Sequence, residues 1–87
     1  MIFEWDENKN QANIEKHGLD FEMAKVLFEG DLLVVPDLRI DYNEPRFIGY
    51  GKIENRLVVV VFTERLPDII RIISFRKANS REQKIYK

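Results

Sequence analysis

The spacing of apolar side chains changes along the chain, and each spacing predicts a different kind of element. Phe21, Ala24, Leu27 and Phe28 recur at helical spacing, whereas later apolar residues form short runs rich in β-branched side chains, as strands do. With capping and turn residues at the boundaries, the pattern predicts the order β-α-α-β-β-β-β-α. The elements are an edge strand at 2–5, helices at 6–17 and 21–29, strands at 32–35, 46–53, 57–64 and 69–76, and a short helix ending at 86.

Polar and glycine residues mark the ends of these elements. Asp6 and Asp20 are expected N-caps, because a carboxylate can accept the free backbone amides of a first helical turn, and Gly18 and Gly30 are helix stops. The connections between the last three strands are short, which implies an antiparallel meander. The predicted fold class is therefore α+β: a small antiparallel sheet with two N-terminal helices packed on one face and a short C-terminal helix.

Two of the strands predict how the sheet is buried. In the strand at 46–53, Arg46, Tyr50 and Lys52 fall on one face, while the opposite face is apolar or lacks side chains. The run 57–62 shows no alternation at all. It is therefore expected to be a central strand that is buried on both faces.

The last strand carries two arginines whose positions conflict. Arg71 shares parity with Ile73 and Arg76 shares parity with Ile72, so strict alternation places the two arginines on opposite faces. Both can serve one site only if a bulge shifts the alternation or one side chain wraps an edge. We therefore favour Arg76 as the site residue, with Arg65 arriving from the neighbouring strand, over Arg71.

Length and composition limit the class of protein. The chain has 87 residues, of which 45% are hydrophobic, and this predicts one globular domain at 1–87. It has no cysteine, which excludes disulfides and thiolate metal sites. The longest apolar run is too short to cross a membrane and the N-terminus lacks the pattern of a signal peptide, so a cytoplasmic protein without a membrane partner is expected.

Charge is distributed unevenly although the net charge is only −1. Residues 1–45 hold four Lys/Arg and eleven Asp/Glu, a balance of −7, and residues 46–87 hold ten and four, a balance of +6. A basic surface on the second half is a candidate binding site for a polyanion, because each phosphate contact releases counterions. The alternative is that the two halves attract each other across the fold.

Four stretches, in this order and spacing, resemble one known family over nearly the whole chain. They are Phe3-Glu4-Trp5-Asp6 with Lys9 and Asn13; Lys16-His17-Gly18 with Phe21, Glu22 and Ala24; Val59 to Arg65 (VVVFTER); and Arg71-Ile72-Ile73-Ser74 with Arg76, Ala78, Glu82 and Tyr86. This combination is similar to the BrnT toxins of type II toxin–antitoxin modules. Phe75 is a departure, since a small residue, often alanine, is expected there.

The resemblance implies a fold, an activity and a partner. The fold is that of RelE-like ribonucleases, and the activity is metal-independent endoribonuclease cleavage of RNA that inhibits translation and growth, with no cofactor. The partner is a BrnA-like antitoxin with a ribbon-helix-helix DNA-binding dimer. Two toxins are expected per antitoxin dimer, and the protein is expected to reach DNA only through the antitoxin.

RNA cleavage without a metal needs cations that stabilise the phosphorane, and arginine suits this role because its planar fork holds two phosphate oxygens and stays charged. Arg46, Arg65, Arg71 and Arg76 lie on or at the ends of three consecutive strands, so we expect a sheet to bring several of them together. The alternative for any one of them is an arginine in water beside a carboxylate.

The cleavage also needs a general base and a general acid, and for these roles the residues leave alternatives open. His17 titrates near neutrality, but a histidine at a helix C-terminus is equally explained by capping. Glu64 can act as a base or can orient Arg65. Tyr86 can stack on a base or donate a proton, or it can dock the last helix.

These considerations give two sets of candidate residues. The expected catalytic residues are Arg65, Arg76, Glu64, His17 and Lys52, and the expected RNA-binding residues are Arg46, Arg71, Tyr50, Lys77, Arg81 and Tyr86. No metal site is expected, since the acidic segment Asp37, Asp41 and Glu44 is typical of a solvated loop. The rival functions are a non-catalytic RNA-binding domain and a co-repressor that acts by docking an antitoxin.

Overall fold

The predicted order of elements is also the order found in the computed structural model, which describes residues 1–39, 41–65 and 67–86. The second predicted helix divides into one α-helical turn followed by a 3-10 helix, η1. The elements are β1 (Ile2–Glu4), α1 (Glu7–His17), α2 (Phe21–Ala24), η1 (Lys25–Glu29), β2 (Leu33–Pro36), β3 (Phe47–Ile53), β4 (Arg56–Arg65), β5 (Ile69–Lys77) and α3 (Ser80–Ile85).

The ends of the helices follow the predicted chemistry. The Asp6 carboxylate accepts the backbone amides of Asn8 and Lys9, and Asp20 caps α2 in the same way. Gly18 ends α1 at φ +71°, a left-handed conformation that glycine adopts at little cost.

The strands form one sheet in the order β1-β5-β4-β3-β2. Strands β2 to β5 pair antiparallel, as expected, but β1 pairs parallel with β5, so the prediction of a wholly antiparallel sheet was wrong at this edge. Short hairpins force neighbouring strands to be antiparallel, whereas β1 and β5 are separated by most of the chain and are free of this constraint.

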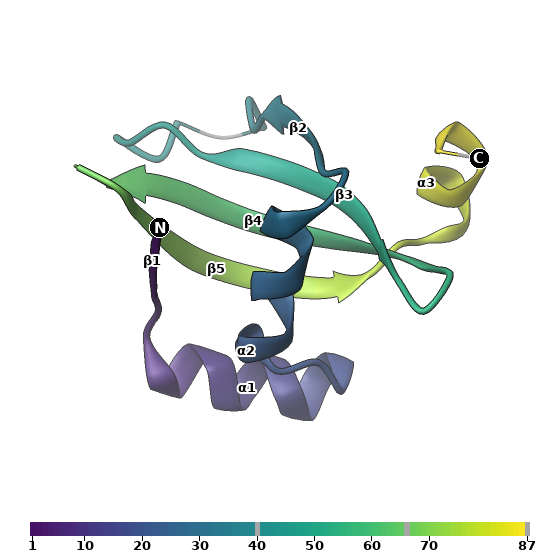
Figure 1. Cartoon of the computed structure of the whole chain (residues 1–87), viewed down its shortest axis with the longest axis horizontal. Coiled ribbons are helices and arrows are strands. Elements are labelled where there is room, and N and C mark those ends of the chain that lie inside the picture. The colour runs from purple at the N-terminus through teal and green to yellow at the C-terminus, as the bar shows by residue number, and fades with distance from the viewer. Residues whose placement is uncertain (40, 66, 87) are drawn as a thin grey trace.

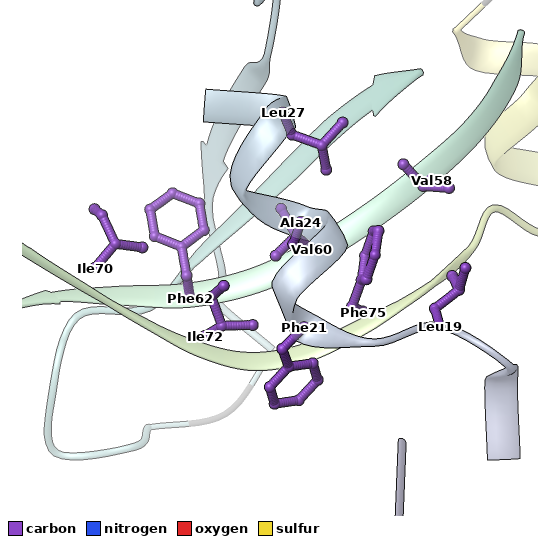
Figure 2. Close-up of a cluster of buried hydrophobic side chains, with 10 residues drawn as sticks. All are labelled: Leu19, Phe21, Ala24, Leu27, Val58, Val60, Phe62, Ile70, Ile72 and Phe75. Carbon is purple, nitrogen blue, oxygen red and sulfur yellow. The ribbon is translucent and has the colours of Figure 1, made fainter. Parts of the chain in front are cut away.

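Both N-terminal helices cover one face of the sheet (Figure 1). Figure 2 shows the buried cluster beneath them, where Phe21 from α2 and Leu27 from η1 meet side chains of β4 and β5. Val58 to Phe62 are buried along β4, which confirms the prediction of a central strand buried on both faces. Apolar side chains of this size contribute about 1.5–3 kcal/mol each when fully buried, so this layer stabilises the fold.

The glycines of β3 allow the helical layer to approach the sheet closely. A Cβ atom on Gly51 would lie 2.9 Å from the Leu27 Cδ2 atom, and one on Gly49 would lie 3.0 Å from the Leu32 Cδ1 atom. Leu27 of η1 and Leu32 therefore pack against the face of β3 that was predicted to be apolar or to lack side chains.

Asn13 closes the edge of β5 where β1 no longer covers it. The Asn13 side chain donates to the Phe75 carbonyl at 2.8 Å and accepts from the Phe75 amide at 3.2 Å, so it stands in for a neighbouring strand. The ring of Phe75 is fully buried in the cluster beneath the helices. The unexpected bulk at this position therefore lies on the opposite face of the sheet from Arg76.

A bulge in β5 changes the faces on which its arginines lie. Val61 pairs with Ser74 and the next residue, Phe62, pairs with Ile72, so Ile73 is an extra residue in β5. As a result Arg71 pairs with Thr63 and Arg76 pairs with Val59, two residues of equal parity on β4. Arg71 and Arg76 therefore share a face, and the prediction from strict alternation was wrong.

Within the residues that the structure describes, no helix is long and apolar enough to cross a membrane.

Candidate functional site

The face of the sheet turned away from α1 and α2, which we call the open face, carries most of the candidate residues. Its middle is apolar, with Val59 and Val61 of β4 both buried. Polar and aromatic side chains lie at its two ends. Tyr50 and Arg76 both pair with Val59 and mark one end, and Thr63 paired with Arg71 marks the other.

The first end is a cluster of Tyr50, Arg76, Glu82 and Tyr86, which we call the α3 cluster. Arg76 donates from Nη1 and Nη2 to the two carboxylate oxygens of Glu82, at 2.8 and 3.0 Å. The rings of Tyr50 and Tyr86 are stacked, with centroids 4.2 Å apart and planes inclined by 19°. Strand β3, strand β5 and helix α3 thus meet in one place.

Hydrogen bonds and burial set the charge states in the α3 cluster. The hydrogen bonds between Arg76 and Glu82 raise the pKa of the guanidinium and lower the pKa of the carboxyl, so this pair is ionised at neutral pH. Burial raises the pKa of Tyr50, and the neighbouring Tyr86 and Glu82 add to this. Tyr50 is therefore a neutral phenol at physiological pH.

Lys52 lies beside the α3 cluster, and His17, the last residue of α1, lies near the same end of the sheet. His17 follows Asn13 by one turn of α1, and Asn13 is bonded to the backbone of Phe75, so His17 lies near the same end of β5. Burial, together with the charges of Lys16 and Arg76, lowers the pKa of His17 and favours its neutral form. The exposed Lys52 and both stacked tyrosines line a hollow of about 370 Å³.

The second end of the open face holds Arg46, Arg65 and Arg71, which we call the arginine end. Arg71 donates to the Glu4 carboxylate at 2.8 Å, and the Arg65 Nε atom lies 3.8 Å from the same oxygen. Arg46 lies with its guanidinium carbon 3.9 Å from the centre of a tyrosine ring. Three of the four candidate arginines thus gather at one end, each next to a carboxylate or an aromatic ring.

The structure separates Arg65 from Arg76, so the expectation that they form one site was wrong. Arg65 lies six positions after Val59, the partner of Arg76, which corresponds to about 20 Å along a strand. Because β4 and β5 form a hairpin, residues just before and just after its turn meet, and Arg76 lies at the far end. Glu64 pairs with Ile70, so it also lies far from Arg76 and on the helix side of the sheet.

Two further candidates lie away from the open face or on its rim. Lys77 pairs with Val58, whose side chain points into the core, so Lys77 has the opposite parity to Arg76 and lies on the helix side. Arg81 is an exposed residue of α3.

Sequence reasoning missed two residues near the α3 cluster. Glu82 was noted only as part of a family pattern, although a Glu at the third position of a capped helix is a recognisable capping box, and the structure contains one with Asn79. Arg39 was not considered. Its positive charge contributes to the low pKa of Glu82 and opposes the rise in the pKa of Tyr50.

The segment after β2 differs from the solvated loop that was expected. The Asp37 side chain is fully buried. It accepts two hydrogen bonds from the Arg39 guanidinium at 2.8 Å each and one from the Tyr42 hydroxyl. The pKa of Asp37 is lowered to about 2, mainly by the hydrogen bonds from Arg39. Within the described ranges, no group of three or more His, Cys, Asp or Glu side chains is placed to hold a metal ion.

Comparison with known proteins places this arrangement in a family. Residues 5–82 match the family model described as "Ribonuclease toxin, BrnT, of type II toxin-antitoxin system". The crystal structure of the Brucella abortus ribonuclease toxin, BrnT, superposes with a TM-score of 0.72 at 31% sequence identity, and the match covers 92% of this chain and 100% of that one. No curated protein matches the chain. The chain belongs to the BrnT family of ribonuclease toxins of type II toxin–antitoxin systems.

Proposed function

We propose that this protein is an endoribonuclease that cleaves RNA at the α3 cluster without a metal ion, and that its activity inhibits translation and growth. The observation that carries the proposal is the position of Arg76 beside the stacked Tyr50 and Tyr86, on the face that α1 and α2 leave uncovered. A guanidinium next to aromatic rings suits a phosphate and its adjoining base.

The proposed reaction is attack of a ribose 2′-oxygen on the neighbouring phosphorus. His17 takes the 2′-hydroxyl proton, since its lowered pKa leaves the imidazole neutral at physiological pH. Arg76 stabilises the charge on the phosphorane. The bond from phosphorus to the 5′-oxygen then breaks, Lys52 or Tyr86 protonates that oxygen, and a 2′,3′-cyclic phosphate remains on the other fragment.

The arginine end extends the proposed RNA path. Arg46, Arg65 and Arg71 present positive charge at the opposite end of the same face, about 20 Å from Arg76 by strand geometry. A single strand of RNA that crosses the open face would meet a cation at each end. This supports binding of several nucleotides with a marked dependence on salt.

The proposed partner is a BrnA-like antitoxin with a ribbon-helix-helix dimer, which binds two toxins and links them to DNA in the cytoplasm. The family supports an antitoxin partner in general. We further propose that the antitoxin covers the open face and so blocks RNA. Its co-expression should restore growth to cells that produce this protein, and a complex purified from such cells should have no ribonuclease activity.

The decisive experiment is an RNA cleavage assay with the purified protein in EDTA. We expect cleavage by the wild type, a loss of about 100-fold or more in Arg76→Ala, and near-wild-type activity in Arg56→Ala, which removes an exposed arginine from the first position of β4. An intact RNA after incubation with the folded wild-type protein would contradict the enzymatic proposal. Equal activity of the two variants would contradict the role of Arg76.

The second candidate function is a non-catalytic RNA-binding or antitoxin-binding co-repressor domain. It is favoured by one observation: both terminal nitrogens of Arg76 are already engaged by Glu82. The same assay separates the two functions, because a binding domain would retain RNA in a salt-dependent manner and leave the strand uncut.

A further inference from the structure

Helix α3 and its C-cap residue contact the sheet through two side chains that lie one helical turn apart. Glu82 binds Arg76, and Tyr86 stacks on Tyr50. The Tyr86 amide donates to the Glu82 carbonyl at 3.1 Å, so the last turn of the helix fixes the two residues relative to each other. An anionic group and a flat ring are thus presented side by side to the sheet.

The surface beneath α3 has a matching pair of groups. Tyr50 and Arg76 lie on strands β3 and β5 and both pair with Val59, so they are separated by two strand spacings, about 10 Å. Val59 between them is fully buried. A ring-stacking residue and a guanidinium therefore flank an apolar floor.

A nucleotide has the same two recognition features as the pair on α3, namely an anionic phosphate and a flat base. Arginine holds phosphate and carboxylate in the same bidentate manner, so a phosphate that binds this edge of Arg76 excludes Glu82. Likewise, a base that stacks on the face of Tyr50 now in contact with Tyr86 must displace that ring.

We propose that Tyr50, Val59 and Arg76 form a subsite for one nucleotide of an RNA strand, and that α3 fills this subsite in the unbound protein by placing Glu82 at the phosphate position and Tyr86 at the base position. The RNA identity of the ligand rests on the proposed function. The subsite itself is deduced from the geometry of the contacts.

The way in which α3 is held allows it to leave the subsite. Within the described residues, none of its six positions is buried, and a helix of this length is marginal on its own. The Ala78 amide donates to the Leu57 carbonyl and fixes the chain just before the helix, while the Asn79–Glu82 capping box lies beyond that point. Movement of α3 therefore begins at Asn79 and leaves β5 undisturbed.

The test measures binding of a 2′-O-methyl RNA tetranucleotide, which has phosphodiesters and bases but lacks the nucleophilic 2′-hydroxyl. We expect Glu82→Gln to lower the Kd by about three- to tenfold, because the competing carboxylate loses its charge. Glu29→Gln is the matched control, since it removes one exposed negative charge from η1, away from α3. Arg76→Ala should abolish the gain when combined with Glu82→Gln.

A second readout follows α3 directly. In nuclear magnetic resonance spectra, the Tyr86 ring signals should lose the ring-current shift from Tyr50 as the tetranucleotide saturates the protein. A Kd of Glu82→Gln that equals or exceeds that of Glu29→Gln would overturn the proposal, and so would Tyr86 signals that stay unchanged at saturation.

The tetranucleotide cannot be cleaved, so this test is independent of catalysis. Tighter binding by Glu82→Gln in a protein that leaves natural RNA intact would support the subsite and contradict the enzymatic proposal. Cleavage of natural RNA by the wild type, with no effect of Glu82→Gln on binding, would contradict the subsite alone.

Discussion

At the scale of single residues, the ionisation of a few side chains sets the state of the α3 cluster. The pKa of Glu82 is lowered by its hydrogen bonds from Arg76, so the folded form prefers the carboxylate more strongly than the unfolded chain does. The stability from this pair is therefore present above the unfolded pKa of 4.5 and is lost as the pH falls through the lower folded value. At neutral pH the Glu82 carboxylate is therefore ionised and the stabilisation from this pair is fully present.

His17 provides a prediction about the pH dependence of cleavage. The pKa of His17 is lowered from its usual 6.5, so we expect the cleavage rate to fall as the pH is lowered through this depressed pKa, because the imidazolium cannot accept the 2′-hydroxyl proton. His17→Gln should lower the rate by about 10²–10⁴ and remove this limb of the pH–rate profile, with an unchanged Tm. An acidic limb of the same shape in His17→Gln would assign the base to another group.

At the scale of elements, the close contact between η1 and β3 depends on a glycine in β3. Gly51 lies directly beneath Leu27, and its missing Cβ atom leaves the space that the leucine fills. Asn13 has a comparable role at the opposite side of the sheet, where its amide replaces a strand along β5. Both features hold the helical layer on one face and leave the other face for the candidate site.

Gly51 therefore gives a prediction about stability. We expect Gly51→Ala to lower the free energy of unfolding by about 1–3 kcal/mol, because the new methyl group would overlap Leu27 and force it to move. Gly30→Ala is the control, since a Cβ atom there meets no atom within 4 Å and the backbone φ of −121° is open to any residue. Urea denaturation measures both variants, and equal stabilities would contradict the packing argument.

At the scale of the whole molecule, the open face has two ends with different chemistry. The α3 cluster combines a guanidinium with aromatic rings and a nearby histidine, and the arginine end gathers three cations around Glu4 and a tyrosine ring. We propose that the α3 cluster cleaves the RNA and that the arginine end positions the RNA backbone.

This division predicts that Arg65 affects RNA binding and leaves the chemistry unchanged. In Arg65→Ala, we expect the slope of log K against log[salt] for a 2′-O-methyl RNA that spans the open face to become shallower by about 0.7, the value for one phosphate contact in a single strand. Cleavage of a dinucleotide should stay at the wild-type rate, because the substrate is too short to reach Arg65. Arg56→Ala should change neither quantity, and loss of dinucleotide cleavage in Arg65→Ala would place Arg65 in the catalytic site.

The sequence by itself determined the elements and the family. Caps such as Asp6 and stops such as Gly18 act on residues one turn away, and the unbroken apolar run of β4 requires burial on both faces, so these features can be read from neighbouring residues. The same local information placed Tyr50 and Lys52 on one face of β3, and with it one part of the candidate site.

Only the tertiary structure decided which of the candidate residues meet. Because Ile73 is an extra residue in β5, Arg71 lies on the open face together with Arg76. The direction of the β4–β5 hairpin places Arg65 about 20 Å from Arg76 along the strands. Glu82 reached Arg76 because α3 folds back over the sheet. These outcomes depend on strand register and chain direction, which are fixed by packing between distant segments, and no pattern of neighbouring side chains encodes them.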